Sequence, residues 1–135
     1  MTSSILTRLL DPRRSPAACL TAALLVLGTA CDRADDHLPL LAGGDADRGR
    51  VVIKKYGCNT CHTIAGVRGA DGLVGPPLTG IAQRMYIGGV ARNTPGNMVS
   101  WIENPKQFDS KTAMPNVGVT HRDAVDIASY LYTLK

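Results

Sequence analysis

The clearest pattern of apolar positions lies near the carboxyl end of the chain. Apolar residues recur there every three or four positions: Ala124, Ile127, Ala128, Leu131 and Leu134. This spacing is typical of one face of a helix. Thr120 and Asp123 come just before it and resemble a capping box, in which side chains bind free N–H groups of the first turn. The pattern therefore predicts a terminal helix that starts after Thr120 and buries one face.

Two further helices are predicted upstream. The first begins at Asp45, which is a good N-cap residue, and runs to about Tyr56, where Gly57 ends it. The second covers residues 95–104, with Thr94 as its cap and a proline at its first helical position. Each has both a start signal and a stop signal, so we expect both to form.

The rest of the domain predicts loops rather than strands. Residues 66–80 hold five glycines and two prolines, and no segment alternates apolar and polar residues convincingly. We therefore expect an all-α fold of about three to five helices with long loops. The whole chain has only six aromatic residues, so the core of so small a domain should be thin, and something besides side chains should help to fill it.

The first 30 residues have the pattern of a secretory signal peptide. Arg8, Arg13 and Arg14 form a basic start, and an apolar run of 14 residues then extends to residue 30. A membrane-spanning helix needs about 20 residues. We therefore predict export, with a retained membrane anchor as the alternative.

Cys31 follows directly after the apolar run. Residues 27–31 resemble the bacterial lipoprotein box, in which the cysteine is lipidated and becomes the mature amino terminus. We therefore predict a lipid anchor at Cys31, a flexible linker to residue 44 and a folded domain over residues 45–135. The alternative is an ordinary cleavage site, with Cys31 left as a free thiol. Export and lipidation together predict a bacterial periplasmic location at the membrane surface.

Net charge is uninformative about most partners. After residue 30 the chain carries 12 Lys and Arg against 10 Asp and Glu, which leaves about +2. This balance gives no case for nucleic-acid binding. A docking surface would have to come from a local arrangement of charges.

The strongest motif is Cys58-Asn59-Thr60-Cys61-His62. In such a sequence the two thiols can each form a thioether with a haem vinyl group, and the adjacent histidine can reach the iron, so it predicts covalent haem c. Two alternatives are a zinc site and a dithiol redox pair. Zinc usually needs a second Cys/His pair, and a thioredoxin-like pair expects a βαβ context, so we favour haem.

The second iron ligand decides what such a haem does. A methionine opposite His62 would raise the reduction potential and occupy the position where oxygen or peroxide binds. Met114 lies in a polar loop without helical periodicity, 52 residues after His62, where nothing else explains a buried apolar side chain. Met98 lies on a helical face, so core packing explains it. We therefore predict Met114 as the ligand, with a packing role as the alternative.

The chain resembles the class I cytochromes c over residues 45–135. Five segments carry the resemblance in family order: Cys58–His62, Gly75-Pro76-Pro77-Leu78, Trp101-Ile102-Glu103-Asn104-Pro105, Ala113-Met114-Pro115 and Ala128-Ser129-Tyr130-Leu131. Residues 93–114 are also similar to the cytochrome c modules that feed haem–copper oxidases. The resemblance implies a small cytochrome c fold wrapped around one covalent haem, with iron ligated by His62 and Met114.

The resemblance also implies roles for residues around the haem. The Pro76 carbonyl would accept a hydrogen bond from the His62 ring, and Trp101 would lie along the methionine side. Arg84 and Thr112 would lie near the propionates. Three apolar side chains would wall the haem: Leu78, Ile102 and Leu131. The first and last helices would cross, with Gly49 against residues 127–130.

These features predict an electron carrier rather than an enzyme. It would be monomeric and exchange electrons with redox proteins, with a terminal oxidase as the expected acceptor. Four lysines are candidates for steering an acidic partner: Lys54, Lys55, Lys106 and Lys111. The alternatives are a haem protein that binds ligands or reduces peroxide, and a fixed electron-transfer subunit of a membrane dehydrogenase.

Overall fold

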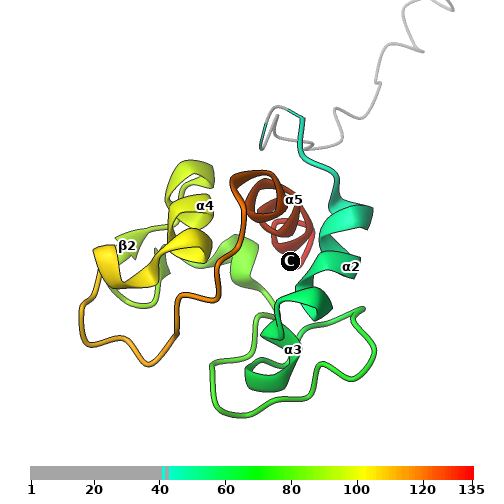
Figure 1. Cartoon of the computed structure of the whole chain (residues 1–135), viewed down its shortest axis with the longest axis horizontal. Helices are drawn as coiled ribbons and strands as arrows, with labels where there is room; N and C mark the ends of the chain where they lie inside the picture. Colours follow the sequence, from blue (N-terminus) through cyan, green and yellow to red (C-terminus); the bar gives the residue numbers. More distant parts are fainter. Residues whose placement is uncertain (1–40, 42) are drawn as a thin grey trace, which may run out of the picture. The chain divides into compact units, whose positions relative to one another are not determined.

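The computed structural model describes residue 41 and residues 43–135. The predicted signal peptide and Cys31 lie outside this part of the chain. The described part contains helices α2 (Ala46–Lys55), α3 (Cys58–Cys61), α4 (Pro95–Glu103) and α5 (His121–Leu131), the 3₁₀ turns η2 (Ile81–Gln83) and η3 (Pro105–Gln107), and strands β1 (Tyr86–Ile87) and β2 (Ala91–Arg92). It is mostly helical (Figure 1), so the predicted all-α class is confirmed.

The expected caps define where the helices start. Asp45, Thr94 and Thr120 each accept a backbone N–H from three residues further on, at 3.0, 3.2 and 3.3 Å respectively. The end of α5 differs from the prediction. The helix stops at Leu131, so Leu134, which continues the apolar spacing, lies beyond it and packs on the core from an irregular end. Apolar periodicity reports burial, which a chain can continue after its helical hydrogen bonds cease.

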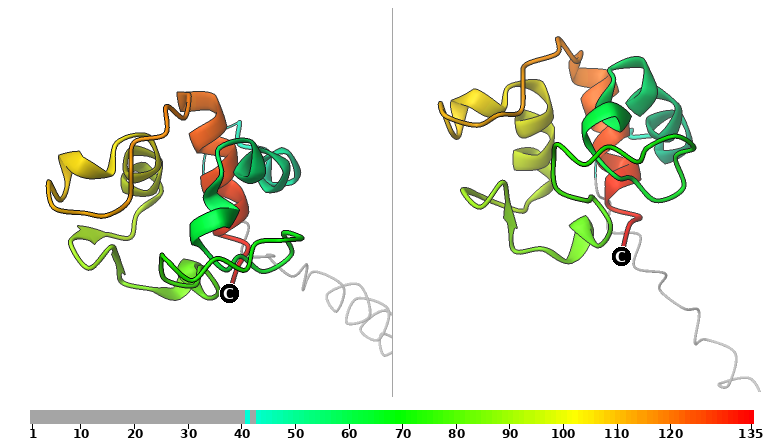
Figure 2. Two further views of the ribbon diagram at one scale, coloured as in Figure 1. Left: turned by 60° about the horizontal axis from the view of Figure 1, so that its bottom comes forward. Right: turned by 90° about the horizontal axis from the view of Figure 1, so that it is seen from below.

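Helices α2 and α5 lie side by side (Figures 1 and 2) and form the largest contact between elements. Gly49 makes this approach possible, because a Cβ atom there would lie 3.0 Å from the Ile127 nitrogen and closer still to the Asp126 carbonyl. The predicted crossing at Gly49 is confirmed, and the contact is with the backbone of residues 126–127. Ile53 and Ile127, both almost fully buried, extend the contact into the core.

A buried carboxylate links the same two helices. Asp123 on α5 accepts hydrogen bonds from three groups: Tyr56 Oη at 2.6 Å, Arg48 Nη1 at 2.8 Å and Lys55 Nζ at 3.0 Å. The hydrogen bonds from Tyr56 and then Lys55 hold the pKa of Asp123 well below its usual range. The Lys55 ammonium is thus part of an ion pair between the two helices, although much of its side chain is exposed; its candidate role in steering a partner stays a prediction.

Asp126 makes a second link between these helices. Its Oδ1 accepts the backbone N–H of Asp45 at 2.7 Å, and its Oδ2 pairs with Arg48. Its side chain is only 2% exposed, so both oxygens need these partners. The start of α2 is thereby tied to the middle of α5.

The segment between η2 and α4 contains a strand pair that the pattern of apolar positions did not predict. Strands β1 and β2 form a two-residue antiparallel pair with Tyr86 opposite Arg92. The expectation of no strands is therefore wrong for residues 86–92, because a two-residue strand is too short to show alternation. Gly88 and Gly89 turn the hairpin with positive φ angles of 57° and 78°.

In the described part of the chain, no helix is long and apolar enough to cross a membrane.

Candidate haem site

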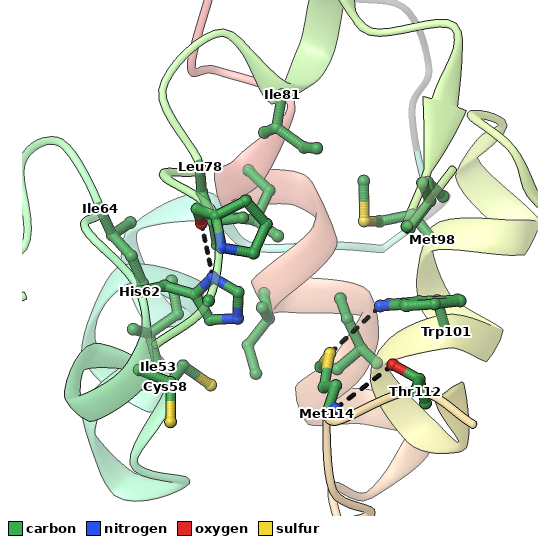
Figure 3. A pocket seen from close by; sticks show the side chains of 18 of the residues that line it. Ile53, Cys58, His62, Ile64, Leu78, Ile81, Met98, Trp101, Thr112 and Met114 are labelled. Atoms are coloured by element: carbon green, nitrogen blue, oxygen red, sulfur yellow. Dashed lines mark hydrogen bonds between the residues drawn. The ribbon is translucent and has the colours of Figure 1, made fainter. Parts of the chain in front are cut away.

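An apolar cavity of about 250 Å³ opens between the α3 segment on one side and α4 and the loop after it on the other (Figure 3). Its walls come from every main element: Ile53 of α2, Cys58 and Cys61 of α3, Ile81 of η2, Met98 and Ile102 of α4, and Ile127 and Leu131 of α5. The helical faces that the sequence pattern assigns to the core therefore also line this cavity.

The Cys58–Cys61 motif forms the one-turn helix α3. Gly57 precedes it with φ of 72°, a left-handed conformation that glycine adopts easily. This turn places both half-buried thiols on the cavity wall. Burial raises the pKa of the Cys58 thiol. His62 follows directly in extended conformation and lines the cavity beside them.

The His62 ring is oriented by the loop that follows. Its Nδ1 lies 2.7 Å from the Pro76 carbonyl oxygen, which is the contact that the resemblance implies. Because a carbonyl can only accept, Nδ1 must carry the proton, and Nε2 keeps its lone pair free. Gly75 is also required here: a Cβ atom at that position would lie 2.7 Å from Nδ1 and 2.8 Å from Nε2. The loop backbone therefore lies flat against the imidazole.

Met114 lies across the cavity from His62 (Figure 3). Its Sδ accepts a hydrogen bond from Trp101 Nε1 at 3.1 Å, and its backbone N–H donates to Thr112 Oγ1 at 3.3 Å. Trp101 is buried in α4, whereas Met114 is half-buried on the loop. Met85, the remaining methionine among the described residues, is 73% exposed on the surface and does not line the cavity.

The other predicted haem contacts also line the cavity: Leu78, Arg84, Ile102, Thr112 and Leu131. The Arg84 guanidinium is anchored by the carbonyl groups of Pro77 and Thr79, the latter at 3.1 Å. Three further wall residues were not predicted from the sequence: Ile53, Met98 and Ile127. Their helical spacing marks them as buried, but spacing cannot separate a side chain that meets another side chain from one that faces a cavity.

These residues fit a covalent haem. Two thiols and an imidazole lie on one wall, a thioether lies on the opposite wall, and the space between them is apolar. His121 has a different environment, since its ring is exposed and lies 2.7 Å from Glu103 Oε1. Within residues 41 and 43–135, no group of three or more His, Cys, Asp and Glu side chains is placed to bind a bare metal ion.

The fold and the site together define a class I cytochrome c, a small helical protein built around haem. The family model for cytochrome c matches residues 46–135, so the chain belongs to this family. A curated relative from Synechocystis sp., described as cytochrome c-553-like, is 33% identical over 91 residues, which cover 67% of this chain and 70% of the relative. Family membership implies covalently bound haem c and a role as a haem electron carrier.

Proposed function

We propose that this protein carries single electrons on one haem attached through Cys58 and Cys61 and ligated by His62 and Met114. The observation that carries the proposal is the placement of the His62 imidazole and the Met114 thioether on opposite walls of one apolar cavity (Figure 3). Haem c bound in this way supplies reversible one-electron chemistry.

Several residues of this chain would orient the iron ligands and bind the polar edge of the haem. The hydrogen bond from His62 to the Pro76 carbonyl holds the ring in the tautomer that can ligate through Nε2. Met114 would occupy the position that an exogenous ligand needs. Arg84 uses part of its five-donor guanidinium on loop carbonyls and lines the cavity. Its remaining donors are available for a haem propionate, and Thr112 is a second polar group that lines the cavity.

Electron exchange would occur where the cavity reaches the surface. Val74 lines the cavity and is 82% exposed, and its neighbour Leu73 is 87% exposed. We propose that a redox protein docks over this edge and that a terminal oxidase is the acceptor. The steering set is Lys54, Lys55, Lys106 and Lys111. A lipid on Cys31 would keep the domain at the periplasmic membrane surface.

Optical spectroscopy of the holoprotein tests the ligand set. The oxidised protein should show the weak Met-to-iron charge-transfer band, and the reduced protein should not bind carbon monoxide. Met114→Ala should abolish the band and admit carbon monoxide. Met98→Leu is the matched control because Met98 also lines the cavity, and it should keep both wild-type properties. Carbon monoxide binding by the reduced wild-type protein would overturn the proposal in favour of a ligand-binding haem protein.

Kinetics and mass spectrometry test the partner and the anchor separately. Stopped-flow oxidation by solubilised oxidase should slow as salt increases, and Lys111→Gln should flatten this dependence. A rate independent of salt would count against steering by lysines. The mass of the mature protein should include acyl groups, and Cys31→Ser should release the domain from membranes. A mature wild-type protein without acyl groups would refute the anchor.

A further inference from the structure

A groove of about 330 Å³ lies between α4 and α5, on the side of these helices that faces away from the haem cavity. Six residues line it: Leu41, Gly96, Val99, Ser100, His121 and Val125. Each residue turns an α-helix by about 100°, so side chains two positions apart point in nearly opposite directions. Ser100 in the groove is therefore opposite Ile102 in the haem cavity. The same holds for Val125 and Ile127 on α5.

The described end of the predicted linker already lies in this groove. Leu41 lines it, is half-buried and packs against the core. Its carbonyl accepts the Gly44 N–H at 2.8 Å, which is the hydrogen bond of a β-turn. Gly44 in turn lies against α5 (Figure 1), because a Cβ atom there would be 3.2 Å from both Ser129 Cβ and Val125 Cγ1. This turn brings the linker onto the domain at the groove.

The sequence before Leu41 indicates what covers the rest of the groove. Residues 38–40 lie outside the described part of the chain and have the sequence Leu-Pro-Leu, whereas residues 32–37 are mostly charged. Residues 38–41 are therefore an apolar segment in a polar linker, and the last of them already lines the groove. Burial in the groove would remove this segment from water. We propose that residues 38–41 dock between α4 and α5 and that Leu38 is the second side chain to enter the groove.

Pro39 decides which leucine joins Leu41. Its ring fixes φ at about −65° and restricts the preceding residue to extended backbone, which favours a polyproline II conformation. That helix has three residues per turn and rises about 9 Å in each turn, so Leu38 lies on the same side as Leu41. Leu40 points away from Leu41 in polyproline II and in a β-strand alike. The same restriction reduces the entropy that the segment loses on docking.

Docking would fix the place where the tether leaves the domain. Residues 32–40 separate Cys31 from Leu41, whereas only residues 32–37 would separate it from a docked Leu38. The loss of three residues shortens the reach of the tether by about 10 Å. Because the groove and the haem cavity lie on opposite sides of α4 and α5, the haem side stays free for a redox partner. This consequence rests on the proposed lipid anchor, but the docking itself does not.

Thermal unfolding of the mature holoprotein with its complete linker tests the proposal. Leu38→Ser should lower the midpoint by about 4 °C, a small effect because ordering the linker offsets part of the burial. Leu40→Ser is the matched control and should keep the wild-type midpoint. NMR of the reduced holoprotein then locates the contact. A nuclear Overhauser effect should join the methyl groups of Leu38 and Val125, and none should join Leu40 and Val125.

Several results would overturn the docking. Equal midpoints of Leu38→Ser and wild type, or no contact between Leu38 and Val125, would show that the segment does not bind in the groove. An equal loss in Leu40→Ser would refute the assignment of Leu38. A wild-type midpoint that rises with protein concentration would show that a second copy of the chain covers the groove. The charge-transfer band and the mass of the anchored protein are separate measurements, so the docking can fail while the proposed function stands.

Discussion

Replacing Gly49 with alanine tests whether the close approach of α2 and α5 holds this fold together. The new methyl carbon would lie 2.5 Å from the Asp126 carbonyl carbon and 3.0 Å from the Ile127 nitrogen, whereas ordinary contacts begin at 3.4 Å. The obstacle is helix backbone, which cannot rotate away as a side chain would. The two helices must therefore separate by about 1 Å, and they form the largest contact in the domain.

Two opposing terms set the size of the effect. Overpacking of this kind costs about 1–3 kcal/mol. Alanine in place of glycine inside a helix returns about 1 kcal/mol through its higher helix propensity. We therefore expect Gly49→Ala to lower the free energy of unfolding by up to about 2 kcal/mol, and each kcal/mol corresponds to a fall of about 4–8 °C in Tm in a domain of this size.

Gly96 in α4 provides a matched control, because a Cβ atom there meets nothing within 4 Å. Gly96→Ala should gain the propensity term alone and raise stability by about 0.5–1 kcal/mol. Urea denaturation of both holoproteins, followed by far-UV circular dichroism, measures the two changes. If Gly49→Ala proves as stable as Gly96→Ala, the crossing has room for a methyl group and the reasoning from close packing is wrong.

Three further predictions concern the contacts around α5. The pKa of Asp123 is low, first because of the Tyr56 hydrogen bond, so this carboxylate stabilises the fold above about pH 4 and ceases to do so as the pH falls. Urea denaturation between pH 7 and pH 3 should show a smaller loss of stability in Asp123→Asn than in wild type. An equal loss of stability in the two proteins would contradict this. Burial raises the pKa of Tyr132 to about 12 from its usual 10, so stability should decline as the pH rises from 10 towards 12. Tyr132→Phe should show a smaller decline between pH 10 and pH 12. At pH 7 it should be about 1 kcal/mol less stable than wild type, because it lacks the hydrogen bond to Asn93. If the variant loses as much stability at high pH as wild type does, another group is titrating. Thr120→Ala should lower the free energy of unfolding by about 1 kcal/mol because it removes the cap of α5, whereas Thr120→Ser should keep most of the wild-type stability. Equal stability of the two variants in thermal unfolding would argue against the cap.

The helices were predictable because their signals are local. Asp45, Thr94 and Thr120 act as caps within three residues of the groups they bind, and a stripe of apolar residues describes one helix face wherever the helix packs. Two features differ from the prediction, and in each case the local pattern was insufficient. The β1–β2 hairpin is too short to leave a pattern, and the apolar spacing continues to Leu134 although α5 ends at Leu131.

Charge was the least predictable property. Lys55 has the sequence context of an exposed surface lysine, and much of its side chain is exposed, but its ammonium group contacts Asp123, 68 residues away. The two acidic residues of α5, Asp123 and Asp126, have an ordinary charged character in the sequence and are buried in the structure. Their partners come from α2 and its ends. A pairing between distant segments leaves no trace in the local sequence of either one.

The motif from Cys58 to His62 is contiguous, so covalent haem attachment could be predicted from the sequence alone, and family membership agrees with it. The sequence also determined the helices, since their periodicity and caps act over a few residues. The loop context and the family resemblance predicted Met114 opposite His62, and the packing of the elements explains how it comes to lie there. Met85, Met98 and Met114 are chemically equal, and the packing of α4 and its following loop leaves Met85 exposed and Met98 on the cavity wall while it brings Met114 to Trp101. His62 and Met114 are 52 positions apart and come to line the same cavity only through the packing of whole elements, so local periodicity alone does not determine their placement.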